Sequence, residues 1–180
     1  MKLPDNKYQI IYADPPWDYK GQKQHCKVKD TGGAISHYGT MTVDEMKKNI
    51  VLPADTNCLL FMWTSSPHLN QAIDLAEHWG FKYATVAFVW DKQMVNPGFY
   101  TMSQCELCLV FKKGKIPSPR GSRSVRQLYS EKRGEHSRKP CEIRNKIHEM
   151  FPTQQKIELF ARERVDGWDC WGNEVDKYST

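Results

Sequence analysis

The stretch that most constrains the fold runs from Tyr8 to Trp17 and reads YQIIYADPPW. An apolar, β-prone run stops there at an acid, two prolines and a tryptophan. Such a short run predicts a buried central strand over residues 8–13. In open α/β sheets, ligands bind in the crevice outside the carboxyl ends of the strands. Asp14 is therefore expected where binding or catalysis takes place.

The two prolines make the next segment stiff and rich in hydrogen-bond acceptors. Pro15 and Pro16 each fix φ and restrict the preceding residue to extended geometry. They also remove two backbone donors, so carbonyl oxygens and the Asp14 carboxylate dominate the local polar groups. Such a site suits a substrate that presents N–H groups. The alternative is structural: Asp14 caps a turn, the prolines end a strand and Trp17 packs in the core.

The exocyclic amine of a nucleobase is a substrate of this kind. Its lone pair is delocalised into the ring, so the amine attacks an electrophile poorly. If Asp14 accepts one N–H and the Pro15 carbonyl the other, the nitrogen rehybridises toward sp3 and the lone pair is freed. Trp17 is expected to stack on the base, an interaction that contributes about 1–3 kcal/mol.

Composition is that of an ordinary soluble protein. The 180 residues fit one domain, 1–180, and no apolar run approaches the ~20 residues of a membrane span. No signal peptide is visible. The six cysteines are scattered, and several lie in apolar segments, as reduced buried thiols do. We expect a cytoplasmic protein of a bacterium or a phage-infected cell, or a nuclear one if the source is eukaryotic.

A metal site is not expected. Cys105 and Cys108 lie in a strand-like run, where residues three apart point to opposite faces. His25 and Cys26 are a better ligand pair, but no second pair follows at zinc-finger spacing.

Positive charge is concentrated in one segment. Ten Lys or Arg outnumber two Glu between residues 112 and 139, although the whole chain carries only +5. Such an excess of positive charge favours contact with nucleic-acid phosphates over a loop that is only solvated. Its Gly, Ser and Pro content predicts a mobile substrate-binding loop over 113–138. Residues 18–40, long, lysine-rich and without periodicity, are expected to form a second mobile loop, a lid over the site.

The remaining pattern alternates helices and strands. A capping box at Thr42 predicts a short helix to about Asn49, and a second helix is expected from Ser66-Pro67 to Gly80. Further expectations are strands over 57–63, 83–90, 105–111, 156–160 and 168–171, a loop over 91–103 and a helix over about 139–150. Strands joined by helices predict an α/β fold with a mostly parallel sheet flanked by helices.

Several motifs together resemble one known family. ADPPW after an apolar strand resembles the catalytic motif of the adenine-N6 methyltransferases related to the catalytic subunit of the messenger-RNA adenosine methyltransferase. The other matching stretches follow in the family's order: YGTMTVDEM, CLLFMW, CELCLV, HSRKP, KIELFAR and WGNE. The resemblance implies a Rossmann-like, S-adenosylmethionine-dependent domain in permuted order, with the catalytic strand first and the donor-binding strand last.

The resemblance also implies roles for individual residues. The catalytic set is Asp14, Pro15, Pro16 and Trp17; the acceptor contacts are Tyr38, Glu106 and Lys139; the donor contacts are Asp14, Lys139, Arg162, Asn173 and Glu174. Structural alternatives stay open. Tyr38 then packs under its loop, Glu106 faces water at a sheet edge, Lys139 is a solvated cation, and WGNE is only a turn.

Two departures limit what the resemblance transfers. Ala161 stands where relatives often have glycine, so no phosphate-loop argument applies. Longer relatives hold the cofactor adenine with an upstream acidic segment, so adenine recognition is unassigned here. Glu163, Arg164 and Val165 replace polar residues of those relatives, and no role is transferred to them.

The function expected from these features is transfer of a methyl group from S-adenosylmethionine to the N6 amine of adenine in DNA. DNA would bind through residues 18–40 and 112–139, with the target base flipped or already unpaired. The protein is expected to act as a monomer or homodimer. The alternatives are an RNA adenine methyltransferase, a catalytically silent nucleic-acid-binding subunit, or an enzyme for another amine.

Overall fold

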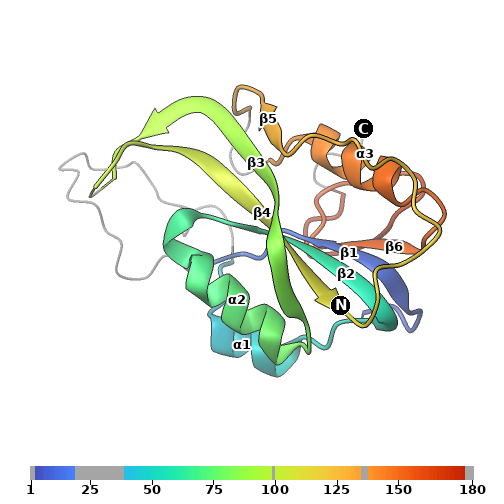
Figure 1. The fold of residues 1–180 in the computed structure, drawn as a ribbon. Helices are drawn as coiled ribbons and strands as arrows, with labels where there is room; N and C mark the ends of the chain where they lie inside the picture. The colour runs from blue at the N-terminus through green and yellow to red at the C-terminus, as the bar shows by residue number, and fades with distance from the viewer. Residues whose placement is uncertain (1–2, 19–38, 99, 135–137, 177–180) are drawn as a thin grey trace.

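A computed structural model describes residues 3–18, 39–98, 100–134 and 138–176, which form one seven-stranded sheet with helices on both faces (Figure 1). The strands are β1 (Tyr8–Ala13), β2 (Ala54–Thr64), β3 (Lys82–Asn96), β4 (Ser103–Lys113), β5 (Leu128–Ser130), β6 (Lys156–Leu159) and β7 (Asp169–Trp171). The helices are α1 (Val43–Asn49), α2 (Leu69–His78), α3 (Cys141–Met150) and a 3-10 turn at Ser66–His68. None of the helices in these ranges is long and apolar enough to cross a membrane.

The sheet has the order β5-β3-β4-β2-β1-β6-β7. Its pairs β1/β2, β1/β6, β6/β7 and β3/β5 are parallel, whereas β4 runs antiparallel to both β2 and β3. Six of these seven strands therefore point the same way, which confirms the mostly parallel α/β sheet. Their carboxyl ends meet at one edge, together with the first residues of β4.

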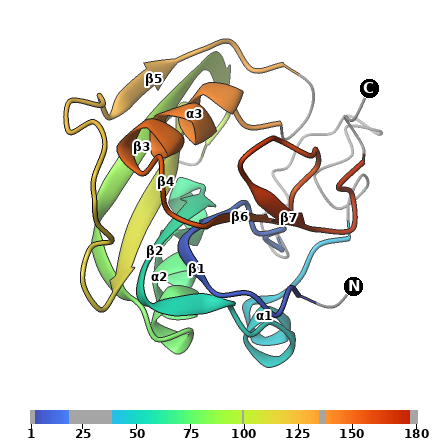
Figure 2. The ribbon, with the colours of Figure 1, turned by 90° about the vertical axis from the view of Figure 1, so that its right-hand side faces the viewer.

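Alternating side chains of the central strands fill two separate cores. Ile11 and Ala13 of β1 pack with α1 and α2, whereas Ile10 and Tyr12 pack with α3. Figure 2 shows α3 on one side of the sheet and α1 and α2 on the other. Burial on both faces explains why residues 10–13 of β1 are an unbroken apolar run rather than an alternating one.

The predicted helix termini are confirmed to within about two residues. Thr42 Oγ1 accepts from the Glu45 amide and Glu45 Oε2 accepts from the Thr42 amide, which is the expected capping box. The second helix begins as a 3-10 turn whose N-cap is Ser65, one residue earlier than expected. Gly80 ends this region with φ +83°, a conformation that favours glycine.

The predicted loop over residues 91–103 is too long at both ends. β3 continues to Asn96 and β4 begins at Ser103, so the two strands form a long antiparallel hairpin that projects from the body (Figure 1). Neither helix layer covers this extension, and Val95 and Met102 are more than half exposed. A strand that is not half-buried lacks the apolar alternation by which strands are identified from sequence.

The basic segment also contains structure that the sequence did not predict. Leu128–Ser130 form β5, which adds to the edge of β3. Closer to β4, the Pro119 carbonyl accepts from Gln154 Nε2 at 2.8 Å, and Arg120 lies over the Phe151 ring. A strand of three residues whose leucine is exposed is too short to show the alternation of apolar and polar residues that predicts a strand. Mobility of residues 113–138 stays a prediction.

Replacing Leu60 by alanine should lower the free energy of unfolding by about 2–5 kcal/mol, because this fully buried β2 side chain leaves a cavity. Chemical denaturation measures the change. Val51→Ala is the control: Val51 is 80% exposed, and its replacement should change stability by less than about 0.5 kcal/mol. Equal effects of the two substitutions would contradict the placement of the core.

Candidate active site at the carboxyl edge of the sheet

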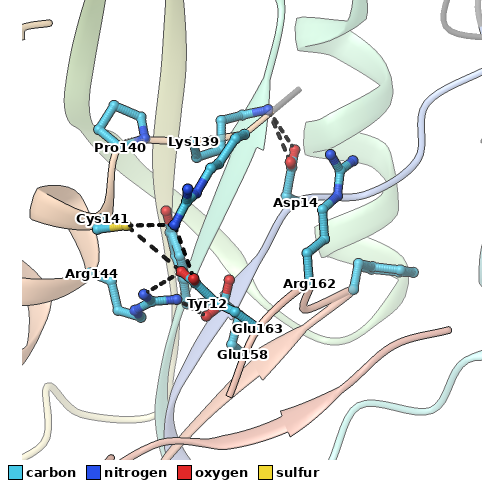
Figure 3. Close-up of a pocket in the computed structure, with 11 residues that line it drawn as sticks. Tyr12, Asp14, Lys139, Pro140, Cys141, Arg144, Glu158, Arg162 and Glu163 are labelled. Atoms are coloured by element: carbon cyan, nitrogen blue, oxygen red, sulfur yellow. Dashed lines mark hydrogen bonds and ion pairs between the residues drawn. The ribbon is translucent and has the colours of Figure 1, made fainter. Parts of the chain in front are cut away.

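The candidate residues gather at the edge where the parallel strands end. Asp14 follows β1, Arg162 follows β6 and Glu174 follows β7, while Glu106 lies near the start of the antiparallel β4. Lys139 precedes α3 and reaches the same edge (Figure 3). The topology therefore brings together residues from both ends of the chain.

Lys139 is the charge at the centre of this site. Its Nζ lies 2.9 Å from each carboxylate oxygen of Asp14, 125 residues away in sequence, and 3.3 Å from Glu106 Oε2. The ammonium also lies 5.6 Å from the centroid of the Trp63 ring. Burial alone lowers the pKa of Lys139, but the carboxylates of Asp14 and Glu106 outweigh burial and raise it. Lys139 is therefore charged, and it is not a merely solvated cation.

Glu106 does not face water at a sheet edge. Its strand, β4, lies between β2 and β3, and its carboxylate is 22% exposed. Burial raises the pKa of Glu106, but Lys139 and Lys92 outweigh that effect, so the pKa lies below its ordinary value. The structural alternative for Glu106 is wrong, and its contact with an acceptor stays a prediction.

The DPPW segment forms a tight turn below the site. The Pro15 carbonyl accepts from the Trp17 amide at 2.9 Å, and the Pro16 carbonyl accepts from Met41 at 2.8 Å. This second bond holds the two ends of segment 18–40 together beside Asp14. Residues 19–38 lie outside the described part of the chain, so the role of Tyr38 and of the lid stays a prediction.

Trp17 lies in the core, as the structural alternative for this residue predicted. Its ring is 5% exposed, its Nε1 donates to the Trp63 carbonyl, and it stacks on His68 with centroids 5.9 Å apart. Little of the ring is available to a base. Stacking of Trp17 on a base therefore stays a prediction that requires the ring to be uncovered.

Three of the residues expected on the donor side lie in two segments that pack together: Arg162 follows β6, whereas Asn173 and Glu174 follow β7. Phe160 has φ +59°, an unusual conformation for a residue other than glycine. The Ala161 amide donates to the Trp171 carbonyl, and a Cβ on Gly172 would lie 2.7 Å from Ala161 backbone atoms. Only glycine fits at position 172, so the WGNE stretch packs closely against the backbone of Phe160 and Ala161. Arg162 Nε lies 3.6 Å from Glu174 Oε2.

A small pocket joins the segment after β6 to Asp14. It is lined by Tyr12, Asp14, Arg138, Lys139, Pro140, Cys141, Arg144, Glu158, Phe160, Arg162 and Glu163 (Figure 3). Three predicted donor contacts, Asp14, Lys139 and Arg162, lie on its wall, and Glu174 is connected to it through Arg162. Asn173 is exposed in the adjoining turn.

The sequence prediction missed an arginine that supports the floor of the pocket. Arg144 of α3 is 6% exposed and places its two terminal nitrogens 2.7 Å from Glu158 and 2.7 Å from Glu163. Burial raises the pKa of Glu158 despite Arg144, whereas Arg144 outweighs burial at Glu163 and lowers its pKa. Arg144 thus ties α3 to β6 and to the turn that carries Arg162. Its only sequence signal was an arginine beside Ile143 on a predicted apolar face.

Comparison with known proteins identifies the family. The MT-A70 family model matches residues 8–174, which is nearly the whole chain. The chain belongs to the MT-A70 family of methyltransferases. The DPPW motif on which the resemblance rested thus follows the carboxyl end of β1 in an MT-A70 domain.

Relatives of this MT-A70 chain differ widely in length. Type II methyltransferase M.MunI of Mycoplasma sp is 50% identical over 97% of this chain and 80% of its own length. A Medicago truncatula protein described as a putative N(6)-adenosine-methyltransferase MT-A70-like is 32% identical over 94% of this chain. The human N(6)-adenosine-methyltransferase catalytic subunit METTL3 is 27% identical over 94%. The chain spans about a quarter of the length of the latter two, 26% and 28%.

Replacing Arg144 by methionine should lower the free energy of unfolding of this MT-A70 domain by about 3–5 kcal/mol, because two largely buried carboxylates lose their partner. Arg164→Met is the matched control, since the Arg164–Asp176 pair is exposed and should contribute nothing measurable. Denaturant titrations compare the variants. If both substitutions were silent, Arg144 would not fix the floor of the pocket.

Proposed function

We propose that this protein transfers a methyl group from S-adenosylmethionine to the N6 amine of adenine in DNA. The observation that carries the proposal is the Asp14 carboxylate at the tip of the central strand, held by Lys139 at the mouth of a pocket of mixed charge. Relatives named N(6)-adenosine-methyltransferases, aligned over 94% of this chain, support adenine N6 as the acceptor.

The acceptor amine would be oriented by oxygen atoms of the DPPW turn. The Pro15 carbonyl already accepts from Trp17, but a carbonyl oxygen has two lone pairs and retains one for the amine. Both Asp14 oxygens contact Lys139, and the ammonium neutralises the carboxylate, so Asp14 is a stronger acceptor for the amine when Lys139 gives up one of these contacts. Glu106 provides a second carboxylate for the ammonium at that moment.

The pocket beside Asp14 suits the polar groups of the donor. S-adenosylmethionine supplies an activated methyl group on a sulfonium, and it also presents an ammonium, a carboxylate and a ribose diol. Lys139 and Arg138 can meet the carboxylate, Asp14 can meet the ammonium, and Glu174 can accept from the diol beside Arg162. Asn173, in the same turn, offers an amide to the diol.

Methyl transfer then requires little more than orientation. Asp14 and Pro15 localise the lone pair of the amine, which forms the new N–C bond as the S–C bond breaks. The methylated amine then carries one proton too many. It loses this proton to Asp14, which already accepts a hydrogen bond from that N–H group. Because the amine must meet the methyl group in line, the base must be flipped or already unpaired.

DNA is proposed as the acceptor because the relative at 50% identity is named a Type II methyltransferase. RNA is the second candidate, favoured by the adenosine-methyltransferase relatives, which are less similar and several times longer. Phosphates would meet the basic segment 112–139, where Arg123 and Arg126 are exposed.

Asp14→Asn should lower methyl transfer to adenine at least about 100-fold, because the amide loses the charge that makes the amine electron-rich. Labelled donor is incubated with DNA and RNA of one sequence, and the modified nucleoside is identified by mass spectrometry. Asp74→Asn, at an exposed surface pair, should leave activity unchanged. N6-methyladenine formed equally well by Asp14→Asn would remove Asp14 from the mechanism.

The double variant Arg123→Ala, Arg126→Ala should raise KM for DNA without changing kcat, since both side chains are exposed and neither lines the pocket beside Asp14. The slope of log KM against log salt concentration should fall by about one for each phosphate that the protein no longer neutralises. Lys7→Ala, Lys82→Ala removes the same charge from exposed positions elsewhere. An identical salt slope in both double variants would argue against DNA binding by this segment.

A further inference from the structure

Lys92 of β3 is a buried cation to which neither the motifs nor the family resemblance assigned a role. The residue is 5% exposed, and its Nζ lies 3.4 Å from Glu106 Oε1. A buried ammonium is costly unless it is paired with an opposite charge. Its position beside Glu106 therefore suggests a use at the catalytic edge.

Glu106 connects Lys92 to the catalytic carboxylate. Its Oε1 faces Lys92, and its Oε2 lies 3.3 Å from Lys139, which in turn contacts Asp14. Positive and negative groups thus alternate along the series Lys92, Glu106, Lys139 and Asp14. The four charges come from β3, β4, the residue before α3 and the end of β1, and together they sum to zero.

Lys92 affects whether the carboxyl groups of Asp14 and Glu106 can both be ionised. If Asp14 and Glu106 shared Lys139 alone, the like charges would favour protonation of one carboxyl group. Burial acts in the same direction at Glu106, yet Lys139 and Lys92 together hold the pKa of Glu106 below its ordinary value. On the β2 side, the Lys139 ammonium lies over the ring of Trp63, which carries no charge. Lys92 is therefore the cation that balances the second carboxylate.

We propose that Lys92 is a positioning residue for methyl transfer, which keeps Glu106 ionised and turned toward Lys139. Glu106 then holds the Lys139 ammonium when adenine takes its place on Asp14. Without this second anchor, Lys139 stays on both Asp14 oxygens, and the carboxylate that it neutralises is a weaker acceptor for the amine. The inference rests on the proposed function, because it assigns Lys92 a part in the same reaction.

Changing the Lys92 side chain should leave the fold intact. The contact of Lys92 with the basic segment is made by its backbone carbonyl, which accepts from the Arg133 amide at 3.0 Å. Lys92→Met removes the charge and keeps the length, whereas Lys92→Arg keeps the charge. Lys82→Met is the matched control, since Lys82 is an exposed lysine at the far end of the same strand. If Lys92→Met does not fold, Lys92→Gln replaces it.

The first measurement is kcat for adenine methylation in DNA as a function of pH. In Lys92→Met the acid limb should move to higher pH by about 1 unit, because removal of a nearby positive charge raises the pKa of a carboxyl group. KM for DNA should stay within about twofold, Lys92→Arg should restore the profile and Lys82→Met should match the wild type. A profile for Lys92→Met that is parallel to the wild type would overturn the proposal.

The second measurement needs neither donor nor DNA. The Glu106 side-chain carboxyl carbon, assigned by the disappearance of its signal in Glu106→Gln, is titrated by NMR in the wild type and in Lys92→Met. The pH midpoint of this signal should rise in Lys92→Met. In a variant that already carries Glu106→Gln, adding Lys92→Met should not lower kcat further. An unmoved midpoint refutes the inference about Lys92. A wild type that methylates neither DNA nor RNA refutes the proposed function instead, whatever the midpoint does.

Discussion

The ion pair between Lys139 and Asp14 is the interaction on which the site depends. It joins the residue that precedes α3 to the end of β1 across 125 residues of sequence. A lysine that is 15% exposed is stable there only because the carboxylates of Asp14, which follows β1, and of Glu106 in β4 compensate its charge. The sheet order makes this possible, since it brings the tip of β1 and the start of β4 to the same edge.

The same pair makes Asp14 a weak acceptor for an amine, because the Lys139 ammonium neutralises the carboxylate. Both oxygens of Asp14 are engaged, and the Pro15 carbonyl has one lone pair in use. In the proposed reaction an exchange strengthens Asp14 as an acceptor: adenine takes one Asp14 oxygen and Lys139 turns toward Glu106. A second anchor already 3.3 Å from the ammonium allows this exchange without a large movement.

Structure that is local or strongly patterned could be predicted from the sequence. The apolar run of β1, the Thr42 capping box and the apolar face of α3 with Ile143 and Ile147 each leave a signal in neighbouring residues. The uncovered half of the β3–β4 hairpin and the three-residue β5 left no such signal, because their side chains are not buried in a regular alternation. Motif resemblance named Asp14, Glu106, Lys139 and Arg162 but could not show which of them pair. Arg144 and Lys92 were not predicted, because a single charged residue in an apolar or mixed segment does not show which residue it pairs with in the fold.

The central claim is that an adenine amine replaces Lys139 on the Asp14 carboxylate. A crystal structure with demethylated donor and an adenine-containing oligonucleotide tests this claim most directly. The account predicts the exocyclic nitrogen within hydrogen-bond distance of Asp14 and of the Pro15 carbonyl, with Lys139 moved toward Glu106. An adenine bound elsewhere, with both Lys139–Asp14 contacts intact, would contradict the account.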